Sequence, residues 1–429
     1  MSDFLKRELV CGNALGEEGP ACRVRVGVFS KVAPALTSSA LLCARPKLSS
    51  IRGMPRIPFV AKWVCVVLFA SLASAILANP ANATAILPTG DKYMYPFIND
   101  SPSGGKRDYA SVFGAYGDID YPDYNFDDRD AQFFLDFQTQ ALAPAGKGIS
   151  SYRVVSMTLT VVVLKYIEDM GFNYDPTPDP LSTFLDRSTD SDAGRPMELF
   201  GVGYRSGWTR ANFTEDSPFK SVDGYNQVRN VYALDFDSNG TARDVSNNVD
   251  DRFETNPWAV ADSPGFIDLN DNYVESPIAP GSLMPEGRVM RFQVDTNDLF
   301  ISAYLQESLN AGRLHLMVSS LYGTTERSSS IPKFYTKDVG FSALSPQLEA
   351  EVLLMPTTTI EKISGGFRVN FDTVPGQSYQ VQYRDSLTSG SWLPLGTLRA
   401  GTGGLLSHDD STTAMSRFYR VSVSKNQQS

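Results

Sequence analysis

The sequence predicts an all-β protein, and three observations support this. Short runs of alternating apolar and polar residues, separated by clusters of Gly, Pro, Asn and Asp, dominate the chain after Ala85. This is the pattern of half-buried strands joined by turns. Helical periodicity is nearly absent from the same region, and 429 residues are enough for two folded units. The strand spacing, with long polar loops between strands, favours a jelly-roll β-sandwich as the larger unit.

Five runs show the strand pattern of the larger sandwich. Alternate residues of each run are apolar, so each presents one apolar face to a core. In the second run we expect Val155, Met157 and Leu159 on the buried face. The only helix that we expect covers residues 298–309. The five predicted strands are residues 132–139, 153–165, 196–204, 289–295 and 313–322.

The first 83 residues have the features of an export signal. Basic residues between positions 54 and 62 precede a 16-residue, largely apolar run at 63–78, and small residues then offer cleavage points. We interpret residues 54–83 as a secretory signal peptide and residues 1–53 as a non-native extension from a mis-assigned start. The apolar run is short for a transmembrane span of about 20 residues. We therefore expect a protein of the cell envelope or the extracellular space that does not span the membrane after cleavage.

Charge and cysteine content differ on the two sides of the predicted cleavage region. Ten of the 38 basic and four of the 48 acidic residues precede position 79, which leaves 28 basic and 44 acidic residues, a net charge of −16, in the rest. Such a charge disfavours binding to nucleic acid and to anionic membrane surfaces. All four cysteines also precede position 79. The mature chain therefore has no disulfide, and no zinc site built on cysteine.

The order of strands and loops resembles a known family. An acidic, aromatic loop precedes FFLDFQTQALAPAGKG, a strand of alternating Thr and Val follows, and the region closes with PKFYTKDVGFSALSPQLEAEV. This order is similar to the DNRLRE-type domain of secreted bacterial proteins, a jelly roll related to carbohydrate-binding modules. The chain departs from the family pattern by an insert at about residues 171–280. On this resemblance we assign residues 84–355 to the jelly-roll β-sandwich domain.

A second resemblance covers the C-terminal residues. The stretches VNFDTVPGQSYQVQYRD and SRFYRVSV are similar to a fibronectin-III-like or immunoglobulin-like module of secreted bacterial proteins. The resemblance assigns residues 356–429 to a small immunoglobulin-like β-sandwich. It implies a spacer or an attachment unit, in which Trp392 belongs to the core rather than to a ligand site.

Three acidic loops contain the oxygen ligands that calcium prefers. In the third, Asp235-x-Asp237-x-Asn239-Gly240 has the spacing of a calcium turn, but Ser246 stands where an EF-hand needs Glu. A solvated Asx turn is the alternative interpretation. The second loop contains Asp175, Asp179, Asp186, Asp190 and Asp192. Calcium is the one candidate cofactor, and its expected ligands are Asp235, Asp237, Asn239 and Asp244 in the third loop and Asp127, Asp128 and Asp130 in the first.

Several aromatic residues lie in loops, among acidic and amide side chains. Aromatic faces together with a few polar groups are suited to binding sugars, although core packing or loop stabilisation is the alternative for each residue. The candidate ligand-binding residues are Tyr121, Tyr124, Trp208, Tyr225, Trp258 and Tyr273.

Residues suited to catalysis are few. The only histidines are His315, at an outward-facing strand position, and His408, in a C-terminal turn. Neither lies near a nucleophile-elbow sequence, so Ser-His-Asp chemistry is unsupported and we assign no catalytic residue. We expect an exported, non-catalytic protein that binds a polysaccharide or a cell-surface or matrix glycan, with calcium assisting. Two alternatives stay open: a structural envelope or adhesion protein that binds other proteins, and a carbohydrate-active hydrolase or lyase with two carboxylates in one cleft.

Overall fold

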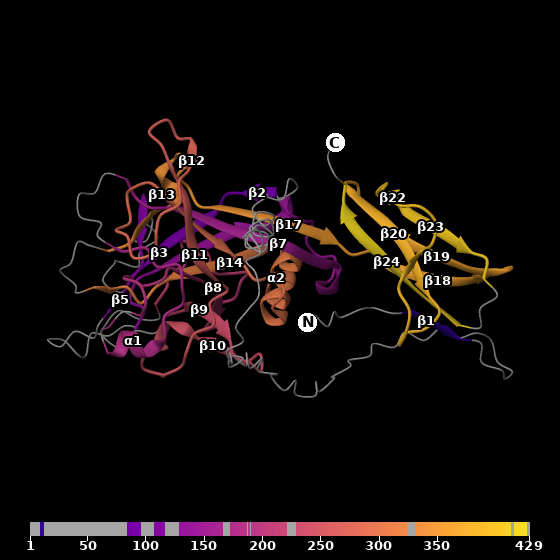
Figure 1. The fold of residues 1–429 in the computed structure, drawn as a ribbon, viewed down its shortest axis with the longest axis horizontal. Helices are drawn as coiled ribbons and strands as arrows, with labels where there is room; N and C mark the ends of the chain where they lie inside the picture. Colours follow the sequence, from indigo (N-terminus) through magenta and orange to yellow (C-terminus); the bar gives the residue numbers. More distant parts are fainter. Residues whose placement is uncertain are drawn as a thin grey trace, which may run out of the picture. The chain divides into compact units, whose positions relative to one another are not determined.

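The computed structural model describes residues 9–12, 84–95, 107–115, 128–165, 172–186, 188, 190–220, 229–324, 331–412 and 416–426. These residues form mostly antiparallel strands in curled sheets, which confirms the predicted all-β, sandwich-like class (Figure 1). One compact unit comprises residues 82–381, 394–412 and 421–429, and the other residues 1–81, 382–393 and 413–420. The boundary predicted between residues 355 and 356 stays a prediction. The predicted signal peptide lies outside the described residues.

The larger sandwich is one long sheet that folds back on itself. Its main strands are β2 (Thr84–Ile86), β3 (Gly90–Met94), β6 (Gln132–Gln138), β7 (Tyr152–Val162), β8 (Glu198–Tyr204), β11 (Ala259–Ile267), β13 (Arg288–Gln293), β14 (Arg313–Ser319) and β17 (Gln347–Leu354). They follow the order β2-β17-β7-β13-β11-β8-β14-β6-β3. β11 belongs to both layers, because Ala259 and Val260 pair with β8 whereas residues 261–266 pair with β13. One apolar core contains residues from both layers.

Shorter strands extend this sheet or form pairs beside it. β9 (Val231–Phe236) pairs with β8 and with β10 (Ala242–Asp244), and β12 (Tyr273–Glu275) pairs with β11. Two further pairs join β4 (Tyr109–Ser111) to β16 (Lys333–Tyr335) and β5 (Gly114–Ala115) to β15 (Gly323–Thr324).

The helix predicted over residues 298–309 is confirmed as α2 (Leu299–Ala311). Asp298 caps its start, because its carboxylate accepts from the backbone N–H groups of Phe300 and Ile301 at 2.8 and 3.0 Å, an arrangement typically worth about 1 kcal/mol. Gly312 ends the helix at φ 77°, a left-handed conformation that glycine adopts without strain. α2 contacts β7 of one layer and β14 of the other. Within the described residues, neither α2 nor the short α1 (Leu181–Leu185) has the length and apolar composition needed to cross a membrane.

β7 departs from its predicted pattern at one residue. Val155 is 39 % exposed, and Val154 is buried in its place. β17 pairs Glu351 with Ser156 and Val352 with Val154, so Val155 is an extra residue without a partner. Such a β-bulge shifts the alternation of the strand by one residue. The prediction of a buried Val155 is therefore wrong.

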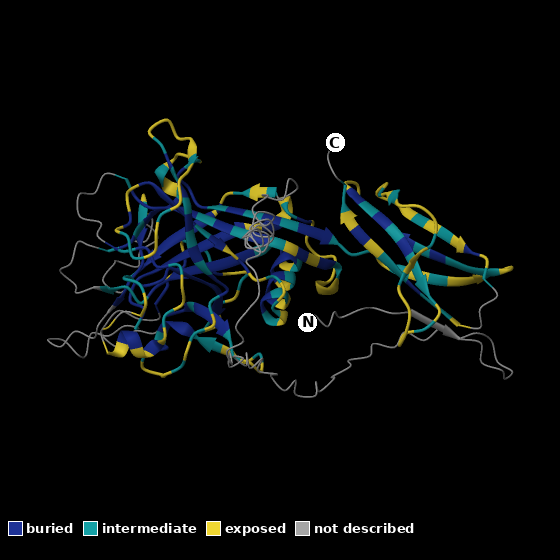
Figure 2. Cartoon of the chain, in the orientation of Figure 1, coloured by how far each residue is buried: buried dark blue, intermediate teal, exposed yellow. Residues whose placement is uncertain are grey.

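The outer face of the layer that contains β6, β14 and β8 is also buried (Figure 2). A second apolar cluster covers it, in which Phe134, Phe200 and Met317 of these strands pack with Phe213 and Phe219 of the loop after β8. The ring of Phe134 meets the ring of Phe213 edge to face, with 5.2 Å between the centroids. The layer therefore lies between two apolar cores.

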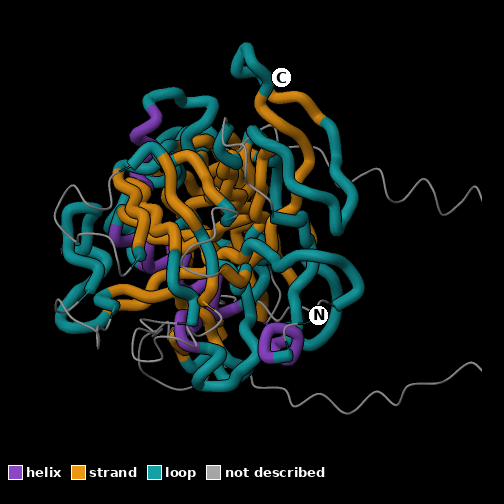
Figure 3. Tube along the Cα trace, turned by 90° about the vertical axis from the view of Figure 1, so that its left-hand side faces the viewer, coloured by secondary structure: helices purple, strands orange, loops and turns teal. Residues whose placement is uncertain are grey.

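This outer layer changes the environment of His315. The sequence pattern predicts an outward-facing strand position for His315, and the side chain is nevertheless fully buried, with 0 % exposure. The reason is that the loop after β8 supplies side chains that cover this face of the layer. Figure 3 shows loops around the strands of the structure. A strand side chain that points away from one core is in water only where no further layer covers that face of the sheet.

The described residues after position 357 also form mainly strands. They are β18 (Thr358–Ile363), β19 (Gly366–Asp372), β20 (Gln377–Arg384), β21 (Leu393–Pro394), β22 (Arg399–Ala400), β23 (Leu405–Asp410) and β24 (Ser416–Lys425). One sheet has the order β18-β19-β23, and the other the order β1-β24-β20-β21, where β1 is Leu9–Gly12. Trp392 departs from its expected core position: it is half-buried, with the guanidinium groups of Arg384 and Arg420 each 4.5 Å from its ring.

Replacing Phe213 tests the second core. Phe213→Ala should lower the free energy of unfolding by about 3–5 kcal/mol, because it removes a fully buried ring and leaves a cavity. The matched control is Phe341→Ala, whose ring is 58 % exposed and whose loss should cost less than about 1 kcal/mol. Urea unfolding followed by tryptophan fluorescence measures both values. Equal losses in the two variants would contradict a second core.

Candidate functional site

A groove of about 630 Å³ lies between α2 and the strands β8, β9 and β10. Its volume is within the range of roughly 300–1,000 Å³ that is typical of small-molecule sites. Five half-buried aromatic side chains contribute to its lining, and the buried ring of Tyr304 lies among them. These five residues are Tyr204, Trp208, Tyr232, Phe236 and Phe300.

Two glycines of β8 make room for aromatic rings on one face of the strand. A Cβ added at Gly203 would lie 2.2 Å from the ring of Tyr232, and one added at Gly201 would lie 2.4 Å from the ring of Trp258. Both distances are far below van der Waals contact, so any larger residue would displace these rings. The glycines therefore set the shape of the groove at β8 and β9.

Aromatic contacts continue from the groove into the core. The rings of Phe236 and Trp258 are stacked with 6.4 Å between centroids, and Phe236 also contacts Phe300 at 5.9 Å. Tyr304 of α2 meets Trp258 edge to face at 4.9 Å. Because the rings at the groove rest on buried rings, their positions are fixed before a ligand binds.

Arg210 is the cationic residue that lines the groove. Its guanidinium lies 4.6 Å from the centre of the Tyr304 ring, and its Nε is buried without a hydrogen-bond partner among the described residues. The nearby Arg205, in contrast, pairs with Asp244 while it lies over Tyr232. Arg210 therefore has an unused donor beside the groove.

Tyr204 connects the groove to a buried polar chain. Its hydroxyl lies 2.7 Å from Nδ1 of His315, and Nε2 of His315 lies 3.2 Å from Oδ1 of Asp136. Asp136 also accepts a hydrogen bond from Nε of Arg313 at 2.8 Å. These polar side chains thus link Tyr204, at the groove, to the buried ion pair of Asp136 and Arg313 on the neighbouring strands.

Burial perturbs the pKa values of the three side chains Tyr204, His315 and Asp136. Burial opposes ionisation of Asp136, but hydrogen bonds from Arg313 and His315 hold the pKa of this carboxyl below its usual range. Burial lowers the pKa of His315 and raises the pKa of Tyr204 well above the usual range of a phenol. Both side chains are therefore uncharged at neutral pH.

The predicted aromatic residues do not gather at one place. Trp208 lines the groove. Trp258 is instead buried at 2 % exposure and packs in the core, because Gly201 lets it lie flat on β8. Tyr273 is 51 % exposed on β12 and is not part of the groove lining. The other three predicted residues lie outside the described part of the chain: Tyr121, Tyr124 and Tyr225.

The carboxylates of the third predicted calcium loop have partners within the protein. Asp235 is fully buried and pairs through both oxygens with Arg243. Oδ1 of Asp237 accepts from the backbone N–H groups of Asn239 and Thr241, each at 2.8 Å. This is the geometry of an Asx turn. Calcium binding at this loop stays a prediction.

Two of the remaining predicted calcium ligands, Asp244 and Asp128, are also bonded to other parts of the chain. Asp244 pairs with Arg205. Oδ2 of Asp128 accepts from two backbone N–H groups at 2.8 Å, and burial raises the pKa of this carboxyl to about 6. Asp130 is buried, and Asp127 lies outside the described residues.

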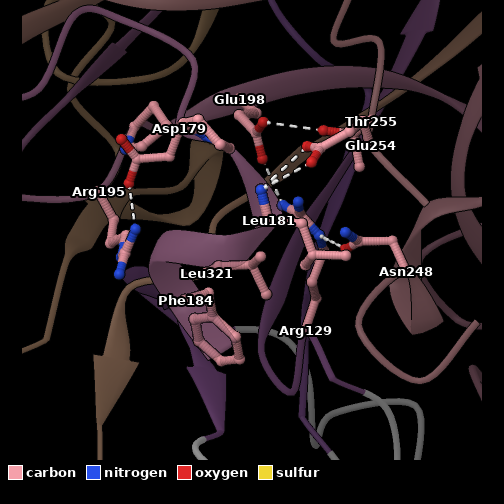
Figure 4. A pocket seen from close by; sticks show the side chains of 12 residues that line it. Arg129, Asp179, Leu181, Phe184, Arg195, Glu198, Asn248, Glu254, Thr255 and Leu321 are labelled. Atoms are coloured by element: carbon pink, nitrogen blue, oxygen red, sulfur yellow. Dashed lines mark hydrogen bonds and ion pairs between the residues drawn. The ribbon is translucent and has the colours of Figure 1, made fainter. Parts of the chain in front are cut away.

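A small polar cavity of about 20 Å³ lies between α1 and β8 (Figure 4). Arg129 and Glu198 form a buried ion pair of 2.5 Å beside it, and Glu254 accepts from the backbone N–H of Leu181 at 2.9 Å. A cavity needs roughly 10–15 Å³ of such volume to hold one water. It is therefore too small for an organic ligand, and its charged groups stabilise one another.

Sequence reasoning missed most of the groove because it searched the loops for aromatic residues. Tyr204, Tyr232 and Phe236 lie in strands, and Phe300 lies on α2. One signal was present in the sequence: the alternating glycines of Gly201-Val-Gly203-Tyr204 indicate a strand face on which other side chains approach the backbone. No protein-family model matches the chain, and a search of curated proteins finds no relative.

The buried imidazole predicts a pH dependence of stability. Folding lowers the pKa of His315 below the value of about 6.5 that it has in the unfolded chain. As the pH falls, the unfolded state therefore takes up a proton before the folded state does. The contribution of His315 is complete above pH 6.5 and is lost in more acidic solution. His315→Gln should therefore lose less stability than the wild type between pH 7.5 and pH 5. Urea unfolding at both pH values measures this, with His408→Gln as the control that should keep the wild-type dependence. An unchanged dependence in His315→Gln would contradict the assignment.

Proposed function

We propose that this is an exported, non-catalytic protein that binds a polysaccharide or a cell-surface or matrix glycan in the groove beside α2. The observation that supports the proposal is the group of five half-buried rings around one groove of about 630 Å³. Sugar rings have apolar C–H faces, which stack on aromatic faces, and hydroxyl groups, which need polar partners. Thr209, Arg210 and Glu307 supply such partners at the same groove.

Arg210 favours an acidic glycan over a neutral one. Arg210 lines the groove, and a guanidinium pairs well with a carboxylate. Since the chain as a whole has a net charge of −10, this local cation is needed for an anionic sugar to approach. A uronate-containing polymer is therefore the class of ligand that we test first.

The resemblances described for the sequence support the same class of function. A jelly roll related to carbohydrate-binding modules would bind the glycan, and the C-terminal module would serve as a spacer or an attachment unit. Calcium would assist by holding loops in place. Binding to proteins of the envelope, and cleavage of the glycan, are the two alternative outcomes that the experiment below distinguishes.

Trp208→Ala should weaken glycan binding roughly tenfold or more, because it removes an aromatic contact at the groove. The measurement is depletion of the protein by a panel of insoluble and soluble polysaccharides, followed by calorimetry with the glycan that depletes it. Tyr273→Ala is the matched control, since it removes an exposed ring outside the groove, and it should bind like the wild type. Wild-type protein that no glycan depletes would refute the proposal and favour a protein partner. Release of soluble sugar would favour the hydrolase or lyase.

Arg210→Gln tests the preference for an acidic ligand. The variant should lose roughly tenfold in affinity for a uronate-containing oligosaccharide, since a charge-assisted pair is lost, and clearly less for its neutral counterpart. Calorimetry with both oligosaccharides gives the two ratios. Equal losses for the acidic and the neutral ligand would show that Arg210 supports the groove only through its packing on Tyr304.

A further inference from the structure

A cluster of carboxylates lies in the loops on either side of α1. One carboxylate oxygen from each of Asp175, Asp179 and Asp190 lies within 4.8 Å of the others. Asp192 is next to them, since its backbone N–H donates to Oδ1 of Asp190 at 3.0 Å. Arg195 is the cation that pairs with this group, through Asp179. Among the described residues, the one ion pair of these four carboxylates is that between Asp179 and Arg195.

Several oxygens of the cluster are buried and unused. Asp175 is 2 % exposed, and its Oδ1 accepts from the backbone N–H and the hydroxyl of Thr177 at 2.9 and 3.2 Å. Its Oδ2 is buried without a hydrogen-bond partner among the described residues, and so are Oδ1 of Asp179 and Oδ1 of Asp192. Buried carboxylate oxygens without donors are costly, so native structures rarely keep them without a ligand.

The surrounding chain holds the loops in this arrangement without a ligand. Gly194 allows the segment after α1 to approach the segment before α1. A Cβ at this position would lie 2.8 Å from the carbonyl oxygen of Asn173 and 3.1 Å from Cβ of Asp175. Arg195 donates to Thr183 and, at 2.6 Å, to the carbonyl oxygen of Ser188. The backbone of Tyr174 pairs on its other side with Gly281 and Ser282 at 2.7 and 2.8 Å. The carboxylates are therefore brought together by the fold itself.

We propose that Asp175, Asp179, Asp190 and Asp192 form a binding site for one divalent cation of the calcium class. Calcium binds oxygen ligands at roughly 2.3–2.6 Å, so two ligands on opposite sides of the ion lie about 4.6–5.2 Å apart. The carboxylate oxygens of Asp175, Asp179 and Asp190, all within 4.8 Å of one another, are close enough to contact one such ion. Magnesium dehydrates reluctantly and is usually held by one or two carboxylates, so a group of several carboxylates favours calcium. The ion would use the unpartnered oxygens and offset the negative charge of the cluster.

Calcium titration of the purified, chelator-stripped protein tests the site. Calorimetry should show one saturable calcium site, with magnesium binding more weakly. Asp190→Asn should lower the calcium affinity by an order of magnitude, since it removes one charged ligand. Asp237→Asn is the matched control, because this carboxylate closes the exposed Asx turn of the third loop, and it should bind calcium like the wild type. No uptake by the wild type, or loss of binding only in Asp237→Asn, would overturn the proposal.

Thermal unfolding gives a second readout that distinguishes a cation ligand from a structural residue. Saturating calcium, at about 100-fold its Kd, should raise the Tm of the wild type by about 5 °C. Asp175→Asn should unfold at a higher temperature than the wild type in the absence of calcium, because it removes an uncompensated buried charge, and it should show no calcium shift. A calcium shift equal to that of the wild type would overturn the proposal. No glycan is present in either assay, so these outcomes are independent of the groove.

Discussion

Burial of both faces of the layer built from β6, β14 and β8 leaves most residues of these strands without contact with water. Every polar side chain on them must then find a partner inside the protein, since an unpaired buried group costs roughly 1–3 kcal/mol. His315 and Asp136 meet this requirement across neighbouring strands, and Arg313 completes the set. On β3, Lys92 donates to the carbonyl oxygen of Ser217 at 2.6 Å. These pairs tie the loop after β8 to the strands that it covers.

The same constraint explains why the groove lies where it does. The loop after β8 supplies Trp208 and Arg210 to the groove, and it supplies Phe213 to the second apolar core. Tyr204, at the end of β8, is held by His315 from beneath. The stability of the outer layer and the placement of the groove side chains therefore depend on one segment. A ligand that contacts this loop would act on a part of the protein that is already anchored to a core.

Local sequence signals predicted most of the framework. Asp298 and Gly312 mark the two ends of α2, and alternation located the main strands. A bulge such as that at Val155 has no local signature, because it depends on the register of the partner strand. The burial of His315 had a signal that was not used: Phe133 and Phe134 are adjacent in β6, so apolar residues occupy both faces of that strand. Asp175 and Asp190 were assigned to one acidic loop, but the close approach of their carboxylates could not be predicted, since it arises from tertiary packing around α1 and Gly194.

β11 is one strand that belongs to both layers, and this affects how the large sandwich unfolds. Its first residues are hydrogen-bonded to one layer and the following residues to the other, so neither layer can separate without disturbing a strand that the other needs. Two layers joined only by loops could melt one after the other. Here a single strand couples them, which favours one cooperative, all-or-none transition for the whole sandwich.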